Sequence, residues 1–507
     1  MKRSTTPSFV LELPLAVAPG QERILLGRFE AARRLYNAVL GEALRRQRLM
    51  REARAWHKAR ALKDKKERAA AFRKLGADYG FTSPALSSFG TECKNAAGWK
   101  GRLGAHETQK VSERAFAAVE AFGFGLRGKP RFKGKNRPLH SIEAKSNAAG
   151  IRWKAATGCL EWNGLILAAQ LAAEGKDRWQ QEALARKTKF CRLVWRNLRG
   201  RRRWYIQLLQ AGTSPRKHEI ATGTVGLDVG PSCVAIVAEG AAALVGFCPT
   251  ITQPWQEVRR LQRALDRSRR ATNPHCFGPD GTWKKGTRQS VFSARYRNLK
   301  TRIAEAERRL ASERKRSHGE LANAILSHGT VVQSEALSCR AFQRRFGRSV
   351  KVKAPGLFMQ ILRRKAESAG GEVRDLNTRT LKMSQYDHPT GQYRKKPLSQ
   401  RWHLLGDESA IVQRDIYSAF LARCVIDNRH HPSHIREMWA AAEPLLRQAR
   451  WCRTQPASGK AKALPTVKPS ERVACRRKPA IDHSPDAVAA TREPGNPDGS
   501  AFRTPYL

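Results

Sequence analysis

The stretch Val225-Gly-Leu-Asp-Val-Gly230, followed by Cys233-Val-Ala-Ile-Val237, decides the fold class of this 507-residue chain. Both runs are apolar and a glycine turn separates them, which predicts two consecutive buried strands. Asp228 is the one carboxylate within the first run. Burying an unpaired carboxylate is costly. We therefore expect a compensating group beside Asp228.

Strand and helix patterns alternate through the rest of this region. Residues 330–337 are typical of a short buried strand with Glu335 near its end, and residues 356–376 of a helix followed by another strand. A last helix is predicted over 408–425 and contains Asp415. This βαβ character predicts an α/β domain.

Asp228, Glu335 and Asp415 are the candidate catalytic residues. Each lies at or near a strand end, or on a helix after an apolar run. Carboxylate oxygens are the ligands that Mg²⁺ prefers, and a pair of Mg²⁺ ions supports phosphoryl chemistry. Periodicity alone leaves four nearby acids open as alternatives: Asp375, Asp407, Glu408 and Asp427.

The charge of the chain indicates a polyanionic partner. Lys and Arg number 96 against 43 Asp and Glu, a formal net charge of +53. Such an excess has no use in an enzyme of neutral small molecules and favours nucleic acid. No apolar run is long enough to cross a membrane, and ten cysteines form no C-x-x-C pair. We expect no membrane partner and a reducing, cytoplasmic location.

Basic residues concentrate in three segments. One is the Gly/Pro-punctuated loop 129–137, and another is the turn 199–203 of a hairpin predicted over 190–209. The third is an antiparallel pair of helices over 256–271 and 292–324. The residues predicted to bind nucleic acid are Lys129, Arg131, Lys133, Arg201, Arg202, Arg203, Arg259 and Arg260. Solvated surface charge is the alternative interpretation for each.

The ends of the chain differ in character. Residues 22–56 have the apolar spacing of one long helix, whereas the segment after Trp451 is rich in Pro, Gly and Ser and predicts disorder. Three tryptophans in basic strands, Trp153, Trp195 and Trp204, could stack on bases, although core packing is the favoured interpretation.

The motifs Val-Gly-Leu-Asp228-Val-Gly, Gln-Ser-Glu335-Ala-Leu and Gln-Arg-Asp415-Ile-Tyr-Ser-Ala-Phe resemble the three split RuvC motifs of the TnpB and type V CRISPR effector superfamily. Their order of Asp, Glu, Asp is the family's order. Weaker similarities cover most of residues 128–425 and lie in segments 128–133, 204–208, 263–274, 279–286, 354–358 and 369–373.

The resemblance implies an RNase H-like (RuvC) α/β nuclease domain over residues 219–430, with a helical hairpin insertion at 256–326. It implies an N-terminal β-barrel with an inserted helical bundle over 1–218, which holds guide RNA and target DNA. Residues 431–507 would be a helical end and a disordered tail. The implied activity is RNA-guided DNA cleavage with two Mg²⁺ ions, in the nucleoid of a prokaryote, and a homodimer is left open.

The segment 378–406 departs from the family. The family has a zinc ribbon with two C-x-x-C pairs there, whereas this segment contains no cysteine. Asp387, His388 and His403 lack a pairing pattern, so we do not expect zinc. The resemblance implies that Arg401 faces the scissile phosphate, and a structural ion pair is the alternative.

Two other functions remain open at this stage. The missing cysteines favour a guide-directed DNA-binding protein with little or no cleavage, such as a repressor or a transposon-associated regulator. A guide-independent RNA-binding or transposase protein would suit the charge equally well, but it would explain neither the order of the acids nor the co-linear motifs.

Overall fold

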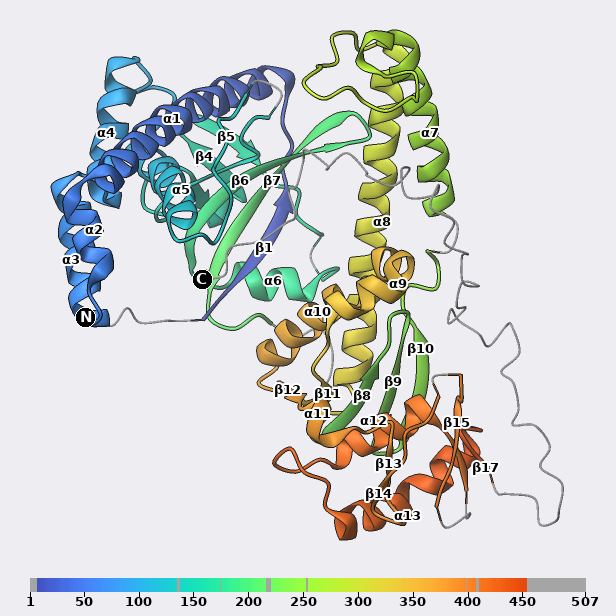
Figure 1. Ribbon diagram of the computed structural model, residues 1–507. Coiled ribbons are helices and arrows are strands. Elements are labelled where there is room, and N and C mark those ends of the chain that lie inside the picture. Colours follow the sequence, from blue (N-terminus) through green and yellow to red (C-terminus); the bar gives the residue numbers. More distant parts are fainter. Residues whose placement is uncertain are drawn as a thin grey trace. The chain divides into compact units, whose positions relative to one another are not determined.

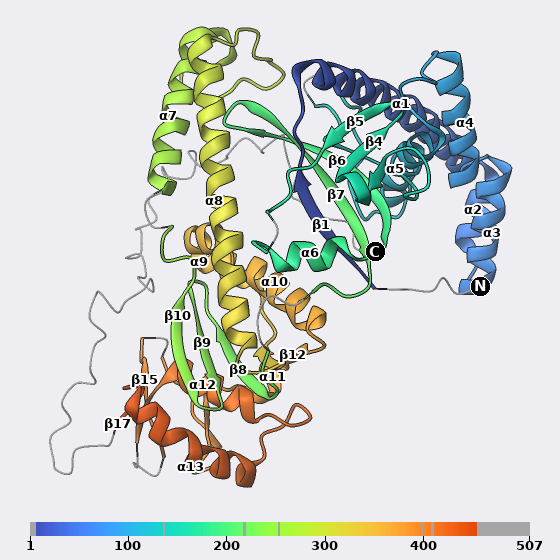
Figure 2. The ribbon, with the colours of Figure 1, turned by 180° about the vertical axis from the view of Figure 1, so that it is seen from behind.

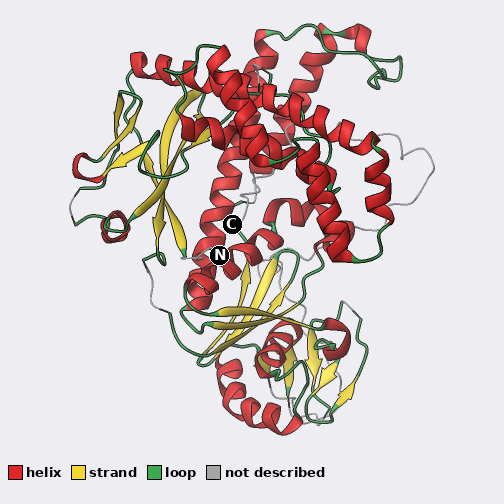
Figure 3. Ribbon diagram, turned by 90° about the vertical axis from the view of Figure 1, so that its left-hand side faces the viewer, coloured by secondary structure: helices red, strands yellow, loops and turns green. Residues whose placement is uncertain are grey.

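The computed structural model describes residues 7–134, 137–173, 175–215, 220–251, 254–397, 399–406 and 410–453. The predicted disordered tail beyond Arg453 and the predicted domain boundary at 218/219 lie outside the described residues. Helices and several sheets alternate along the chain, which confirms the mixed α/β class (Figure 3).

The chain divides into two compact units. Unit 1 comprises Met1–Ala221, Thr252–Glu313 and Arg364–Gly371, and unit 2 comprises Thr222–Ile251, Arg314–Arg363 and Glu372–Leu507. The helical segment predicted as an insertion at 256–326 therefore contributes residues to both units.

Unit 1 contains two antiparallel sheets. Their strands are β1 (Ser8–Pro14), β2 (Ser141–Glu143), β3 (Arg152–Lys154), β4 (Cys159–Trp162), β5 (Leu165–Ala168), β6 (Thr188–Leu198) and β7 (Arg201–Ala211). One sheet has the order β1-β7-β6-β2 and the other β3-β4-β5. The predicted hairpin is the pair β6 and β7, but its turn is only Arg199-Gly200. Both turn residues have positive φ, which a two-residue turn of this kind requires, so Arg201, Arg202 and Arg203 lie in β7 and not in the turn.

Besides the end of the helix over Pro355–Ser368, eight helices contribute to the described part of unit 1. They are α1 (Pro19–Glu52), α2 (Arg54–Ala61), α3 (Lys65–Asp78), α4 (Ser83–Ala96), α5 (Ala105–Gly123), α6 (Arg178–Leu184), α7 (Pro254–Thr272) and the first part of α8 (Ala294–Leu326). Helices α1, α4 and α5 pack on one another (Figures 1 and 2). The single helix predicted over 22–56 is wrong at its end, because Ala53 is extended and α2 starts anew. The break lets Trp56 pack edge-on against Phe72 of α3.

The core of unit 1 holds the three tryptophans that were considered as base platforms. Trp153, Trp195 and Trp204 are 5%, 9% and 3% exposed, so core packing is their role. Helices α7 and α8 lie side by side (Figures 1 and 2). They share a small apolar core of Val258, Leu261, Leu299 and Ile303, as a helical hairpin requires.

Unit 2 is built on a five-stranded mixed sheet. Its strands are β8 (Thr224–Val229), β9 (Cys233–Ala238), β10 (Ala241–Gly246), β11 (Val331–Glu335) and β12 (Glu372–Leu376), in the order β10-β9-β8-β11-β12. Strands β8, β11 and β12 run parallel, whereas β9 and β10 are antiparallel to their neighbours. Helix α12 (Arg414–Cys424) packs on β8 and β9 (Figure 2).

The remaining elements of unit 2 surround this sheet. They are α9 (Cys339–Lys353), α10 (Pro355–Ser368, whose end belongs to unit 1), α11 (Thr378–Leu381), α13 (Pro432–Gln448), β13 (Tyr386–Asp387), β14 (Gln392–Tyr393), β15 (Trp402–Leu404), β16 (Ile411–Gln413) and β17 (Cys452–Arg453). Strands β15, β16 and β17 form an antiparallel sheet.

The helix predicted over 408–425 begins later than expected, at Arg414. Residues 411–413 are instead strand β16, because they pair with β15 on one side and β17 on the other. Strand β17 is distant in sequence from β16, so apolar spacing alone does not reveal this pairing.

Gly226 brings β8 into direct contact with the backbone of α12. A Cβ atom at this position would lie 1.9 Å from the Ala419 carbonyl oxygen and 2.5 Å from the Arg423 nitrogen. Only glycine permits this approach, which sets the distance between β8 and the C-terminal half of α12. In the described part of the chain, no helix combines the length and the apolar character needed to cross a membrane.

Candidate active site

The parallel register of β8 and β11 places two of the predicted acids side by side. Leu227 is paired with Ser334, so the next step along both strands sets Asp228 beside Glu335. Side chains two residues apart share a face of a strand, so Asp228 lies on the same face as Gly226. That face packs against α12. Two carboxylates are thus directed toward α12 at the carboxyl ends of adjacent strands.

The third predicted acid, Asp415, lies in the first turn of α12, where a negative charge is favourable. Gln413, directly before the helix, caps its N-terminus. The Gln413 Oε1 accepts a hydrogen bond of 2.7 Å from the Ile416 N–H. The Gln413 Nε2 donates to Asp415 Oδ2 at 3.3 Å. Gln413 is only 4% exposed, so one buried amide both starts the helix and orients the carboxylate.

The electrostatic surroundings of Asp228 include the other two predicted carboxylates. Burial, then the negative charges of Asp415 and Glu335, hold the pKa of Asp228 well above its usual range. Burial also raises the pKa of Glu335, and a hydrogen bond from the Met383 backbone partly offsets this. Protons or cations are thus favoured at this site.

Two guanidinium groups supply part of the missing positive charge. Arg401 Nη1 lies 3.5 Å from Asp415 Oδ2, and Arg414 Nε lies 3.7 Å from Asp415 Oδ1. Both arginines act to lower the pKa of Asp228, but burial and the two carboxylates outweigh them.

Arg401 reaches the site through the small sheet of unit 2. Trp402 of β15 is paired with Gln413 of β16, and the Arg414 N–H donates to the Arg401 carbonyl oxygen at 2.8 Å. The Arg401 side chain is one-third exposed. It is therefore able to contact solvent or a ligand as well as Asp415.

The donor set of the three acids fits Mg²⁺ in its chemistry. All three groups offer hard carboxylate oxygens, and the raised pKa of Asp228 reports negative charge that a divalent cation would relieve. Among the described residues, no three His, Cys, Asp or Glu side chains already lie in an arrangement that holds a metal ion.

No family model matches the chain, and no curated protein matches it. Similar solved structures include a cryo-EM structure of the Cas12f1-sgRNA-target DNA complex, with a TM-score of 0.39 and 12% identity, covering 82% of this chain and 98% of that chain. Another is a CRISPR-Cas12f ternary complex, with a TM-score of 0.23 and 13% identity, covering 74% of this chain and 75% of that chain. Both TM-scores are low, so neither similarity decides the fold or the activity of this chain.

Two of the four alternative acids, Asp375 and Asp427, are among the described residues. Asp375 is paired with Ser334, which places it on the opposite face of the sheet from Glu335, and it forms an ion pair with Arg363. Asp427 follows the end of α12 with a positive φ. Asp407 and Glu408 lie outside the described residues.

The segment 378–406 has a buried polar cluster in place of cysteines. His403 Nε2 lies 3.2 Å from Asp387 Oδ1, and Lys396 Nζ lies 2.5 Å from His403 Nδ1. His388 contacts Tyr417 Oη instead, with 2.8 Å between its Nδ1 and the phenol. The Leu398 position lies outside the described residues.

The residues predicted to bind nucleic acid all belong to unit 1 and have different surroundings. Lys129, Arg131, Arg201, Arg203, Arg259 and Arg260 are exposed. Arg202 instead pairs with Glu22 at 3.0 Å and lies over the Trp195 ring, and Lys133 is half-buried, with its backbone bonded to Asn37. Burial, followed by nearby arginines, lowers the pKa of Lys133.

Gln413 and Arg414 were not predicted as site residues. The sequence signal for Gln413 is a polar residue directly before an apolar helix. This pattern indicates an N-cap, but it does not predict the second hydrogen bond from Gln413 to Asp415. The sequence pattern predicts Gly226 only as part of a strand, because its contact with α12 depends on the tertiary structure.

Proposed function

We propose that the chain is an RNA-guided DNA endonuclease with a RuvC-like site in unit 2. One observation carries this proposal: Asp228, Glu335 and Asp415, far apart in sequence and in the order typical of the RuvC motifs, lie on one face between β8, β11 and α12. Burial, and then the charges of Asp415 and Glu335, raise the pKa of Asp228, so the three carboxylates share one electrostatic environment. The N-terminal barrel and the split RuvC domain implied by the resemblance belong to this proposal.

The three carboxylates would hold two Mg²⁺ ions. When bound, these ions supply stabilisation of the charge that develops on the phosphate oxygens during hydrolysis. The protein's own residues prepare the site. Gln413 fixes the rotamer of Asp415, and Gly226 keeps α12 close enough for Asp415 to share the site with Asp228.

Arg401 is the side chain best placed to bind the scissile phosphate. It is one-third exposed at the edge of the carboxylate group, and a guanidinium binds phosphate with paired hydrogen bonds. Its present contact with Asp415 is long, at 3.5 Å, beyond the usual length of a charge-assisted hydrogen bond. Exchange of that partner for a phosphate would cost little.

The partners of this nuclease would be guide RNA and target DNA. The net charge of +53 suits a protein that grips two backbones while base pairing reads the sequence. The basic residues of unit 1 would make the contacts.

Guide-directed DNA binding without cleavage is the second candidate. The observation in its favour is that Asp415 already has two arginine partners and that no metal-holding arrangement is present among the described side chains. A protein of this kind would occupy its target and leave both strands intact.

Cleavage of a target plasmid separates the two candidates. The protein would be co-expressed with the RNA that flanks its gene, purified with the bound RNA, and incubated with target DNA in Mg²⁺ or EDTA. We expect wild type to cut only in Mg²⁺, and Asp228→Asn to bind the target without cutting it. Asp375→Asn is the matched control, because it makes the same change on the other face of the same sheet. Equal cutting by Asp228→Asn and wild type would contradict the proposal, and target protection without strand breaks by wild type would favour the second candidate.

A further inference from the structure

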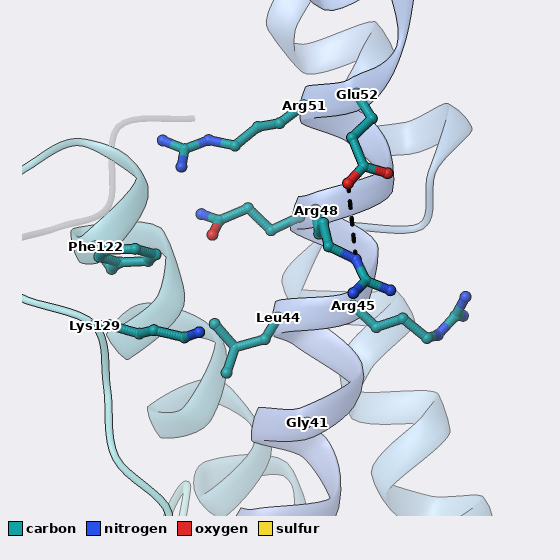
Figure 4. A pocket seen from close by; sticks show the side chains of 9 residues that line it. Gly41, Leu44, Arg45, Arg48, Arg51, Glu52, Phe122 and Lys129 are labelled. Atoms are coloured by element: carbon teal, nitrogen blue, oxygen red, sulfur yellow. Dashed lines mark ion pairs between the residues drawn. The ribbon is translucent and has the colours of Figure 1, made fainter.

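A basic cleft in unit 1 includes Lys129, which is predicted to bind nucleic acid, but its other lining residues have no assigned role. It lies between the C-terminal half of α1 and the end of α5, and its volume is about 480 Å³ (Figure 4). Gly41 and Leu44 form part of its α1 wall, and Phe122 and Lys129 extend into it from the other side. Pockets of this size accommodate small ligands or single residues of a polymer, and not a double helix.

Positive charge dominates this cleft. Arg45, Arg48, Arg51 and Lys129 line it, against one carboxylate, Glu52. The Arg48 to Glu52 contact is 3.9 Å long and both side chains are well exposed, at 70% and 64%. Exposed pairs of that length contribute little, so Arg48 is available to an anionic ligand. The cleft therefore selects an anion.

Aromatic rings accompany the cations. The Arg51 guanidinium lies 5.8 Å from the centre of the Phe122 ring and donates to the Gly123 carbonyl oxygen at 3.2 Å. The Phe132 ring lies next to Gly41, with its Cε1 3.7 Å from the position a Cβ would occupy there. Phe132 is 57% exposed. An exposed ring beside basic residues offers a flat face on which a base could stack.

We propose that this cleft binds a single-stranded stretch of nucleic acid, with phosphates at Arg48 and Lys129 and a base against Phe122 or Phe132. Cations that follow the backbone, together with aromatic rings that stack on bases, are what single-strand binding requires. An acidic peptide would meet the charge but has no use for the rings. The inference rests on the proposed function only in that a guide-bearing nuclease exposes single strands.

Binding of short labelled oligonucleotides to the full-length protein tests this site. Oligouridine, oligothymidine and a duplex of equal length would be titrated by fluorescence anisotropy over a range of salt. We expect Arg48→Gln and Lys129→Gln each to reduce the slope of log K against log salt by about 0.7 for the single strands. Phe122→Leu should weaken single-strand binding by about fivefold or more, the lower end of the stacking range.

Arg34→Gln is the matched control. Arg34 is on the same helix, is 60% exposed and pairs with Glu30 as Arg48 does with Glu52, but it does not line the cleft. A loss confined to oligouridine identifies the guide as the ligand, and an equal loss in both single strands identifies the shared backbone and base chemistry. Salt slopes that are the same for Arg48→Gln, Lys129→Gln and Arg34→Gln would overturn the inference, and so would an equal loss of duplex binding.

These results are independent of cleavage. If wild type cuts target DNA but the cleft variants bind single strands normally, the cleft inference fails and the proposed function stands. If wild type cuts nothing while Arg48→Gln and Lys129→Gln each reduce the slope of log K against log salt, the proposed function fails and the cleft inference stands. Since Arg48 and Lys129 are exposed, their replacement leaves the fold intact even if Phe122→Leu does not.

Discussion

Gly226→Ala tests how closely the site depends on the packing of β8 against α12. The added Cβ would lie 1.9 Å from the Ala419 carbonyl oxygen and 2.9 Å from the Arg423 Cβ. Both obstacles belong to the helix framework, so no side-chain rotation relieves them. The strand and the helix must separate by roughly 1 Å or more to restore ordinary contact.

Gly226→Ala is expected to lower both the free energy of unfolding and the rate of cleavage. Overpacking in a core destabilises by about 1–3 kcal/mol, and a clash with rigid backbone belongs at the upper end, about 3 kcal/mol. Asp228 lies two residues further along the same face of β8, so separation also moves its carboxylate away from Asp415. A displacement of about 1 Å at a reacting centre lowers the rate about 100-fold.

Urea unfolding and the rate of Mg²⁺-dependent cleavage measure these two effects separately. Gly27→Ala is the control, because nothing lies within 4 Å of a Cβ at that position in α1. The control should gain stability by about 0.5–1 kcal/mol, since alanine favours a helix. A Gly226→Ala protein that matches wild type in both stability and cleavage rate would refute the close approach of β8 to α12.

Two further predictions concern buried carboxylates. Because burial and the charges of Asp415 and Glu335 raise the pKa of Asp228, the folded protein keeps this proton to higher pH than the unfolded chain, and stability falls as pH rises above about 4. In urea unfolding with EDTA, the free energy of unfolding of Asp228→Asn should therefore equal that of wild type near pH 4 and exceed it at higher pH. A difference in this free energy that stays constant with pH would contradict the prediction. Burial acts to raise the pKa of Asp387, but hydrogen bonds led by that from His403 outweigh it and lower the pKa to about 2. The stabilisation that this lowered pKa contributes is present above the pKa of the unfolded state and is lost as pH falls toward 2. Asp387→Asn should therefore lower the free energy of unfolding by about 2 kcal/mol at neutral pH. An unchanged urea midpoint would count against the cluster of Asp387, His403 and Lys396.

Local sequence patterns predicted the elements that carry the acids. The two apolar runs at 225–237 became β8 and β9, and Glu335 ends β11 as expected. These elements are recognisable because the strand period and the breakers lie within one short window. The resemblance then ordered the three acids, and the register of β8 and β11 places two of them on neighbouring strands.

Features that depend on distant pairing could not be predicted in this way. Strand β16 has three residues and β17 has two, and each exists because it pairs with a segment far away in the chain. The second hydrogen bond of Gln413 and the backbone contact of Gly226 arise from the same tertiary packing. The cleft at Phe122 joins residues of α1 with a loop after α5, and neither segment has a motif that announces it.

The pairing of β16 with β17 has a consequence for the timing of synthesis. The N–H of Gln413, which caps α12, donates to the carbonyl oxygen of Trp451. Asp228 leaves the ribosome early, but the support for Asp415 arrives only when translation, at about 5–20 residues per second, has passed Trp451. A growing chain therefore holds its first two carboxylates without a completed centre. The proposed nuclease would therefore have the support for its third carboxylate only after residue 451 has been synthesised.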